Sequence, residues 1–288
     1  MNYSNIVKNM VRVGVVNGPA ALGDIKSEEI VRRIEEYLVK LASEEVDIIV
    51  LPEYLDVLGR KKDETLKYAH KEGDDFIERY INFSKKYGIL IFVPLLYRER
   101  EKVFNTTLLI YNGVIIGRYD KVHLSYFERY VLKLIPGNDI KVFDTVWGKV
   151  GVMTCFDAYF PEFSRILGLK GARLIAFPST QRSETEDFLY IQARVRAFDS
   201  SAYIARASYG VPIGHAWKPG IPVGQSFIVS PDTTILANTG RTEGYTYTEI
   251  DMDKKFLREA SHGMPSIPLR NLFRYRRPEL YSYLCKES

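Results

Sequence analysis

The feature of this sequence that most constrains its fold is an alternation of short apolar runs with longer amphipathic segments. The run Asp47–Glu53 is almost continuously apolar, which is typical of a strand buried on both faces of a sheet. The segment before it, Ser27–Val46, places its apolar side chains at helical spacing. These side chains are Ile30, Ile34, Tyr37, Leu38 and Leu41. Helices that alternate with buried strands predict an α/β fold.

The same alternation continues along most of the chain. Further strands are expected at Val11–Asn17, Ile89–Tyr97, Phe104–Tyr111, Val114–Tyr119, Lys149–Cys155, Leu174–Pro178, Ala202–Ser208, Gly224–Val229 and Tyr245–Ile250. Further helices are expected at Asp74–Tyr87, Glu162–Leu169 and Thr185–Asp199. Asn112-Gly113 between two of the strands is a strong hairpin signal, so the sheet is expected to be mixed. We expect one domain over residues 1–288, with an irregular tail from about Gly263, and two facing sheets would accommodate this many strands.

Composition narrows the class of protein. The 288 residues are 46% apolar and 26% charged, as in ordinary soluble domains. The net charge of +4 is spread along the chain, which argues against a nucleic-acid partner, and no apolar run is long enough to span a membrane. The polar start, Met1–Met10, lacks the apolar region of a secretion signal, so we expect a cytoplasmic protein.

Several familiar kinds of site are absent from the sequence. It has no phosphate-binding loop, dinucleotide fingerprint, H-E-x-x-H zinc motif or G-x-S-x-G elbow. The two cysteines, Cys155 and Cys285, form no disulfide framework and no zinc-ligand pattern. The four histidines lack metal-ligand spacing, so the sequence indicates no metal site.

Cys155 is the first candidate for chemistry. It ends a predicted strand, and a helix begins shortly afterwards at Pro161-Glu162. The carboxyl ends of strands are where sites form in α/β proteins, and a backbone N–H beyond the cysteine can face a developing oxyanion. A lone cysteine is also often a small buried hydrophobe, and that alternative stays open here.

Two other charged residues follow predicted strands. Glu53 ends the apolar run, in Leu51-Pro52-Glu53-Tyr54, and Lys121 follows the second strand of the hairpin. A partly buried carboxylate suits general-base work. Taken alone, each residue has a plainer explanation, since a strand-end carboxylate is usually solvated and a lysine usually lies on the surface.

In this order the three segments resemble the nitrilase superfamily of carbon–nitrogen hydrolases. Members use a Glu–Lys–Cys triad, and their P-E, K-x-H-L and C-x-D…F-P-E motifs match Glu53, Lys121 and Cys155. The resemblance extends to Phe177-Pro178-Ser179, to Arg194–Ala197 and to Arg276–Tyr281, so it spans nearly the whole chain. It implies a four-layer αββα sandwich with no metal or organic cofactor, and a homodimer or larger homo-oligomer.

The resemblance also implies roles for individual residues. Glu53 would take the proton of Cys155, the thiolate would attack the substrate carbon, and a thioester would form. The Lys121 ammonium and the backbone N–H of Phe156 would bind the oxyanion. Glu128 matches a second glutamate that many members carry after K-x-H-L, and would orient the substrate or hold Lys121. We interpret His123, in the same motif, as a packing residue.

The substrate is less constrained than the chemistry. Asp157, two residues after the cysteine, favours an amidase acting on a small amide or N-carbamoyl compound over a nitrilase. A nitrilase, an acyl transferase and a non-catalytic or partner-dependent scaffold remain alternatives, although a scaffold is expected to have lost a triad member. Some members that bind carboxylates have an arginine where this chain has Ala158 and Tyr159; Arg182 is another candidate for that role. Candidate pocket residues are Tyr54, Tyr159, Phe160 and Thr180, with Phe160 favoured as a core residue.

Overall fold

The structure is a computed structural model that describes residues 10–23, 25–181, 185–216, 224–259, 262–263 and 265–286. The chain divides into two compact units, which meet between Asp253 and Lys254. The larger unit carries all the residues singled out for chemistry. No helix in the described part of the chain has the length and apolar character needed to cross a membrane.

In the described residues of the larger unit, the strands form two six-stranded sheets that are joined by pairing between β1 and β9. The first sheet runs β12-β1-β2-β3-β4-β5 and the second runs β11-β10-β9-β8-β7-β6. The first contains β1 (Met10–Pro19), β2 (Ile48–Val50), β3 (Leu90–Glu99), β4 (Lys102–Tyr111), β5 (Val114–Asp120) and β12 (Gly244–Asp251). The second contains β6 (Val142–Thr145), β7 (Gly148–Val152), β8 (Leu174–Pro178), β9 (Tyr203–Gly210), β10 (Phe227–Val229) and β11 (Ile235–Asn238). The last residues of β1, Asn17–Pro19, pair in parallel with the last residues of β9, Ser208–Gly210, and this short ladder joins the two sheets.

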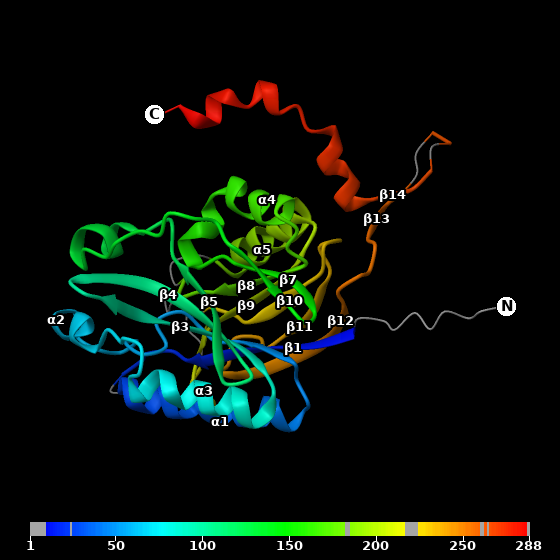
Figure 1. The fold of residues 1–288 in the computed structure, drawn as a ribbon. Helices are drawn as coiled ribbons and strands as arrows, with labels where there is room; N and C mark the ends of the chain where they lie inside the picture. The colour runs from blue at the N-terminus through cyan, green and yellow to red at the C-terminus, as the bar shows by residue number, and fades with distance from the viewer. Residues whose placement is uncertain are drawn as a thin grey trace. The chain divides into compact units, whose positions relative to one another are not determined.

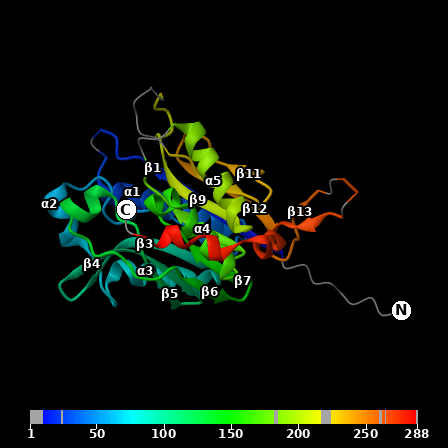
Figure 2. The ribbon, with the colours of Figure 1, turned by 90° about the horizontal axis from the view of Figure 1, so that it is seen from above.

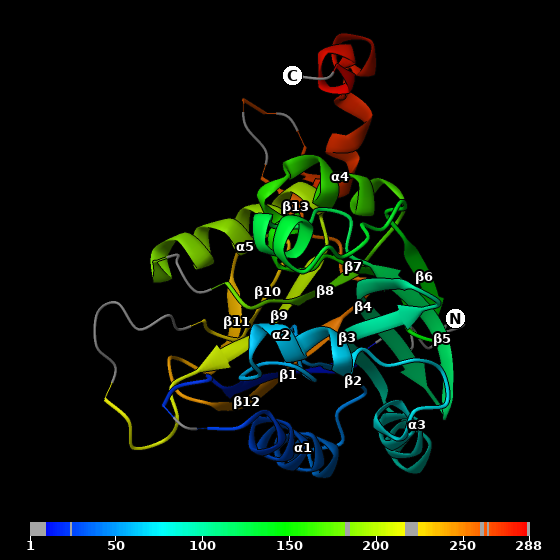
Figure 3. The same ribbon diagram turned by 90° about the vertical axis from the view of Figure 1, so that its left-hand side faces the viewer.

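Helices cover both outer faces of this pair of sheets. α1 (Ser27–Ser43) and α3 (Asp75–Tyr87) pack on the first sheet, and α4 (Pro161–Leu169) and α5 (Glu186–Ser200) lie on the side of the second (Figures 1 and 3). Viewed from above, α4 and α5 lie over the strands of the second sheet (Figure 2). The predicted four-layer αββα arrangement is therefore confirmed.

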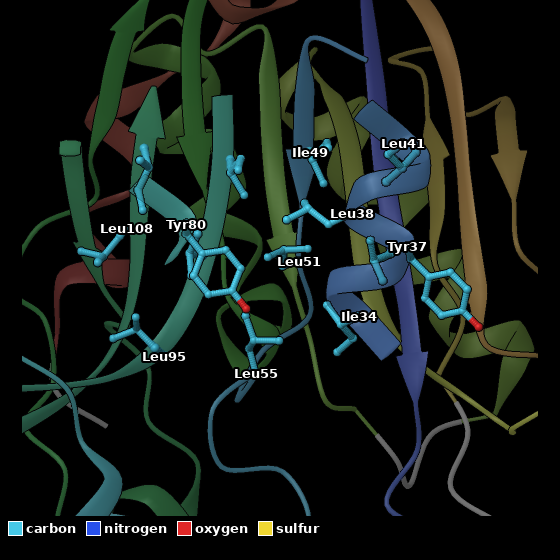
Figure 4. Packing of buried hydrophobic residues seen from close by; sticks show 14 of the residues in the cluster. Ile34, Tyr37, Leu38, Leu41, Ile49, Leu51, Leu55, Tyr80, Leu95 and Leu108 are labelled. Carbon is cyan, nitrogen blue, oxygen red and sulfur yellow. The ribbon is translucent and has the colours of Figure 1, made fainter. Parts of the chain in front are cut away.

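The helix α1 shows why this arrangement forms. Its apolar residues recur every three or four positions, so they make one stripe that faces the first sheet (Figure 4). Ile34 and Leu41 are fully buried there, against Ile49, Leu51 and their neighbours. Each such side chain stabilises the fold by roughly 1.5–3 kcal/mol relative to an exposed one.

Several predicted boundaries change in the structure. The buried run 47–53 forms only a three-residue strand, β2; the Leu51 N–H still donates to the Phe92 carbonyl of β3, and the chain leaves the sheet after Leu51. The short strands β6 and β11 and the single turn α2 (Lys62–Thr65) were not predicted. The hairpin agrees with its sequence signal, because Asn112 (φ 54°) and Gly113 (φ 80°) are both left-handed, as a type I′ turn requires.

The smaller unit, from Lys254 onward, has little regular structure. Its described residues form a two-residue ladder between β13 (Leu257–Arg258) and β14 (Ile267–Pro268), followed by three 3-10 turns. These turns are η4 (Leu269–Tyr275), η5 (Pro278–Leu280) and η6 (Ser282–Cys285). The Arg276–Tyr281 motif contains η5 and the residues on either side of it.

Candidate active site

The three predicted triad residues each lie shortly after the end of a strand. Glu53 follows β2 and Lys121 follows β5, both in the first sheet, while Cys155 comes three residues after β7 in the second. Cys155 opens a 3-10 turn, η3 (Cys155–Tyr159). Glu128 lies on η2 (Phe127–Val131), a single turn of π-helix. The site therefore lies where the two sheets meet.

The backbone is unusual at two positions of the site. Cys155 has φ 46° and Tyr54 has φ 59°, so both adopt the left-handed region although neither is glycine. Such conformations cost about 1–3 kcal/mol and concentrate at functional sites. Each lies three or four residues after the end of a strand, where it turns the chain sharply and fixes the direction of the side chain.

The Glu53 carboxylate is fully buried and surrounded by hydrogen-bond donors. Its Oε1 accepts from Lys121 Nζ and from Asn105 Nδ2, both at 2.8 Å. Its Oε2 accepts from the Thr180 N–H at 2.9 Å and from Thr180 Oγ1 at 2.6 Å. The donors come from β4, β5 and the loop after β8, so one carboxylate ties elements of both sheets together.

Lys121 lies between two carboxylates. Besides Glu53, its Nζ donates to both oxygens of Glu128, at 2.9 and 2.8 Å. Burial alone would lower the pKa of Lys121, but the negative charges of Glu53, of the Cys155 thiolate form and of Glu128 raise this pKa well above its usual value. Lys121 is therefore a permanent buried ammonium.

Glu128 is fixed by the same charge and by further donors. Burial would raise its pKa, but Lys121 and the hydrogen bonds around it lower that pKa overall. Tyr54 Oη donates to Oε1 at 2.8 Å and the Ser125 N–H donates to Oε2 at 2.8 Å. Burial, Glu128 and Glu53 together raise the pKa of Tyr54 well above its usual value, so Tyr54 stays a neutral donor.

Family members usually have an aromatic residue and a glycine soon after the second glutamate, and here the corresponding Leu134–Gly137 come a few residues later. This longer segment folds back onto the lysine. The Gly137 N–H donates to the Lys121 carbonyl at 2.8 Å. A Cβ at Gly137 would lie 2.0 Å from the Asp120 carbonyl oxygen, so the close approach requires glycine. The longer connection between Glu128 and this glycine therefore leaves both the glutamate and the lysine in place.

Cys155 is a neutral thiol in this environment. Burial and the nearby Glu53 charge raise its pKa to about 12, although Lys121 and a backbone hydrogen bond from Thr180 act in the opposite direction. A thiol with this pKa needs a base before it becomes a nucleophile. Glu53, whose Oε2 accepts from the Thr180 N–H and which lines the same pocket as the cysteine, is the carboxylate placed to act as that base.

Asn105 belongs to this network and the sequence analysis missed it. It lies on β4, is 2% exposed, and donates through Nδ2 to both Glu53 (2.8 Å) and Glu128 (2.7 Å). The available signal was a polar residue at a buried position of the apolar strand 104–111. The sequence of one strand does not indicate which carboxylates, distant along the chain, such a residue contacts.

Asp157 and His123 join the segments that carry the site residues. Asp157 Oδ1 accepts from the His123 N–H at 2.9 Å, and its Oδ2 accepts from Tyr119 Oη at 2.6 Å and the Thr154 N–H at 2.9 Å. The His123 ring stacks on Phe160 with centroids 3.8 Å apart. The aspartate thus ties the lysine segment to the cysteine turn, and His123 packs as expected.

A pocket open to solvent leads to these residues. It has a volume of about 1050 Å³ including its mouth, and Glu53, Lys121, Glu128 and Cys155 all line it. Of the predicted substrate contacts, Tyr54 and Thr180 also line the pocket.

The other predicted contacts lie elsewhere. Phe156 and Tyr159 are not among the described residues that line the pocket; their rings contact one another, and Tyr159 also packs against Phe188 of α5. The backbone N–H of Phe156, the predicted oxyanion donor, belongs to the residue directly after the nucleophile, at the start of η3. Arg182 lies outside the described residues. Within the described part of the chain, no group of three or more His, Cys, Asp or Glu side chains forms a metal site.

Fold and site together define a thiol hydrolase of the αββα class, with a Cys, a Glu and a Lys at adjoining strand ends. The chain belongs to the carbon-nitrogen hydrolase family, whose characteristic sequence pattern matches residues 12–255. The resemblance to the nitrilase superfamily is therefore confirmed.

Individual relatives cover most of the chain. Omega-amidase NIT2 of Xenopus tropicalis is 30% identical over 270 residues, covering 90% of this chain and 92% of its own. A nitrilase of Pyrococcus abyssi is 29% identical over 214 residues, covering 72% and 78% respectively. The crystal structure of Saccharomyces cerevisiae Nit3, a member of branch 10 of the nitrilase superfamily, is similar with a TM-score of 0.68 and 25% identity, covering 84% of this chain and 90% of its own.

Proposed function

We propose that this protein hydrolyses a carbon–nitrogen bond of a small amide or N-carbamoyl compound through a thioester on Cys155. An amide releases ammonia and a carboxylic acid, and a carbamoyl compound releases ammonia, carbon dioxide and an amine. The observation that carries the proposal is the buried Lys121 ammonium held between Glu53 and Glu128, in a pocket that a neutral thiol also lines. The similarity to omega-amidases supports the choice of an amide.

The first half of the reaction follows from these positions. Glu53 takes the thiol proton as the sulfur attacks the amide carbon, because a thiol whose pKa is about 12 is not ionised at neutral pH. Lys121 and the Phe156 N–H stabilise the oxyanion. One contact between Lys121 and Glu128 has to open for the ammonium to donate to that oxygen, since its three protons already face carboxylate oxygens. Glu53 then gives its proton to the departing ammonia.

The second half repeats the same roles with water. Glu53 removes a proton from a water molecule that attacks the thioester, Lys121 again faces the oxyanion, and the proton returns to the leaving sulfur. Glu128 keeps Lys121 in position throughout and Tyr54 keeps Glu128 in position, because both are fixed by charge-assisted hydrogen bonds.

The similarity to a nitrilase keeps nitriles as the second candidate substrates. Ammonia release should be measured with short amides, ω-amides of dicarboxylic acids, N-carbamoyl compounds and small nitriles, using wild type and Cys155→Ala in parallel. Release from amides or carbamoyl compounds that depends on Cys155 supports the proposal. Release from nitriles alone replaces it with the nitrilase assignment, and release that persists in Cys155→Ala removes the thioester route.

We further propose that the protein forms a homodimer through α5. Four apolar side chains of this helix are 38–59% exposed and follow helical spacing, so they form a stripe that a lone chain would leave in water. They are Phe188, Ile191, Val195 and Phe198. Ile191→Glu is expected to shift the mass in sedimentation to that of one chain, whereas the exposed Val39→Glu on α1 is expected to leave it unchanged. A single-chain mass for the wild type contradicts the dimer.

A further inference from the structure

The pocket that holds Cys155 has an apolar wall close to the charged residues. Four large apolar side chains belong to its lining: Val57, Leu58, Phe127 and Leu132. The Leu58 N–H donates to the Tyr54 carbonyl at 2.9 Å, and the Leu132 N–H donates to the Phe127 carbonyl at 2.9 Å. The apolar wall therefore lies within one turn of Tyr54 on one segment and of Glu128 on the other.

Three of these four side chains are fixed by the packed interior. Val57 and Leu132 are 5% and 3% exposed and belong to the same buried cluster, although they come from different segments. Leu58 is 5% exposed and belongs to the larger cluster between α1 and the first sheet. A wall made of core residues keeps its shape when a ligand arrives, so little ordering free energy is lost on binding.

Phe127 is the exposed member of the wall. It is 47% exposed, whereas its neighbours on η2, Tyr126 and Tyr130, are 75% and 59% exposed and contact each other with ring centroids 4.9 Å apart. These two tyrosines are not among the described residues that line the pocket. The π-helical turn thus brings Phe127 and the adjacent Glu128 to the pocket and leaves the tyrosine pair outside it.

The cations of the pocket lining are directed elsewhere. The Arg60 Nε donates to the Asp56 carbonyl at 3.2 Å, and a terminal nitrogen contacts Glu28 at 2.8 Å. The same guanidinium lies 3.4 Å from the centre of the Tyr68 ring. These three partners line a separate pocket. Lys62 is solvent exposed, so its charge is already hydrated.

We propose that Phe127 determines specificity by covering an apolar acyl group of the substrate against Val57, Leu58 and Leu132. This inference rests on the proposed amide hydrolysis and deepens it. The substrate class is the amide of an apolar monocarboxylic acid. Its amide carbon lies at Cys155, and its hydrocarbon chain lies between the Phe127 ring and the fixed wall.

The test is a series of amides of increasing length: acetamide, butyramide and hexanamide. In wild type, kcat/KM should rise roughly fourfold per methylene, because each buried methylene contributes about 0.8 kcal/mol and 1.36 kcal/mol is tenfold. Adipamate carries a carboxylate in place of the terminal methyl of hexanamide. It should be at least about tenfold poorer than hexanamide, since its charge would lie against an apolar wall.

Phe127→Ala removes the exposed side of the wall. The rise should fall to roughly twofold per methylene, so the loss on hexanamide exceeds the loss on acetamide by about 10- to 20-fold. Phe127→Leu keeps an apolar side chain and should restore most of the rise. Tyr126→Ala is the matched control, because it removes a more exposed ring from the same turn that does not line the pocket. It should keep the wild-type rise, and urea unfolding of each variant checks that the fold is intact.

Four results would overturn the assignment of Phe127. They are a flat dependence on chain length in wild type, a wild-type preference for adipamate, equal losses on acetamide and hexanamide in Phe127→Ala, and the same change in Tyr126→Ala as in Phe127→Ala. Hydrolysis of acetamide with a flat dependence contradicts only the role of Phe127. Release of ammonia from none of these amides contradicts the proposed amide hydrolysis itself.

Discussion

Glu53 and Asp56 are buried carboxylates three residues apart on one segment, yet their surroundings differ completely. Glu53 accepts four hydrogen bonds, one of them from an ammonium. Asp56 accepts one from the Leu96 N–H at 2.9 Å through Oδ2, and its Oδ1 has no hydrogen-bond partner among the described residues. Burial raises the pKa of Asp56 to about 7. The comparison shows that donors, rather than burial, decide which carboxylate is organised for chemistry.

The strongest way to test this comparison is to neutralise each carboxylate in turn. Glu53→Gln removes the base that accepts the thiol proton, so kcat should fall by about 10²–10⁴-fold. Asp56→Asn keeps an oxygen for the Leu96 N–H and should change kcat by less than about threefold. Steady-state ammonia release measures both. Equal losses in the two variants would contradict the division of roles.

Lys121 gives the organised site its positive charge. Lys121→Met should lower kcat by about 10²–10³-fold, since loss of one oxyanion donor costs roughly 3–4 kcal/mol. The free energy of unfolding should also fall by about 3–5 kcal/mol, because Glu53 and Glu128 are left buried without their counter-charge. Kinetics and denaturant unfolding report the two effects separately. Near-wild-type kinetics with a folded protein would remove Lys121 from the site.

A substitution at Asn105 tests the same comparison of buried carboxylates, with a smaller expected fall in kcat. Asn105→Ala removes a donor from two buried carboxylates, each worth about 1.5–3 kcal/mol to a charged group. We expect a 10- to 100-fold fall in kcat. Asn238→Ala, on the exposed part of β11, is the matched control and should leave kcat within about twofold of wild type. An Asn105→Ala variant as active as this control would show that the amide does not position the carboxylates.

Asp56 should control the pH dependence of stability. Its pKa is about 7 in the folded chain against 3.8 for the unfolded group, so its stabilising contribution is complete below about pH 4 and is lost as the pH rises through 7. Asp56→Asn removes this dependence. Its free energy of unfolding relative to wild type should rise between pH 4 and pH 8 by up to about 4 kcal/mol, at about 1.4 kcal/mol per pKa unit. A pH-independent difference in urea unfolding would contradict the shifted pKa.

Much of the fold could be predicted because local patterns determine it. β8 lies at the predicted residues 174–178, and α1 buries all five of the apolar residues that identified it. β6 and β11 were missed because their residues are half exposed and carry no apolar alternation strong enough to distinguish them from loops. The predicted length of the strand at residues 47–53 was also wrong, because apolar side chains indicate that a segment is buried but not that it pairs with a neighbouring strand.

The candidate site could also be predicted only in part. The triad motifs were readable because each lies within a few residues of one strand end. The contacts that organise the triad were not readable, since they join residues far apart in the sequence. Thr180 reaches Glu53 across 127 residues and Asn105 reaches it across 52. The π-helical turn that carries Glu128 also leaves no periodic signal, because it lasts only five residues.

The central claim is that Cys155 becomes acylated by the substrate. The most direct measurement is intact mass after mixing enzyme with an accepted amide and quenching in acid within one turnover, followed by mapping of the modified peptide. The account predicts an adduct equal to the substrate less ammonia, located on Cys155 and absent from Cys155→Ala. Turnover without such an adduct, or an adduct on Cys285 instead, would contradict it.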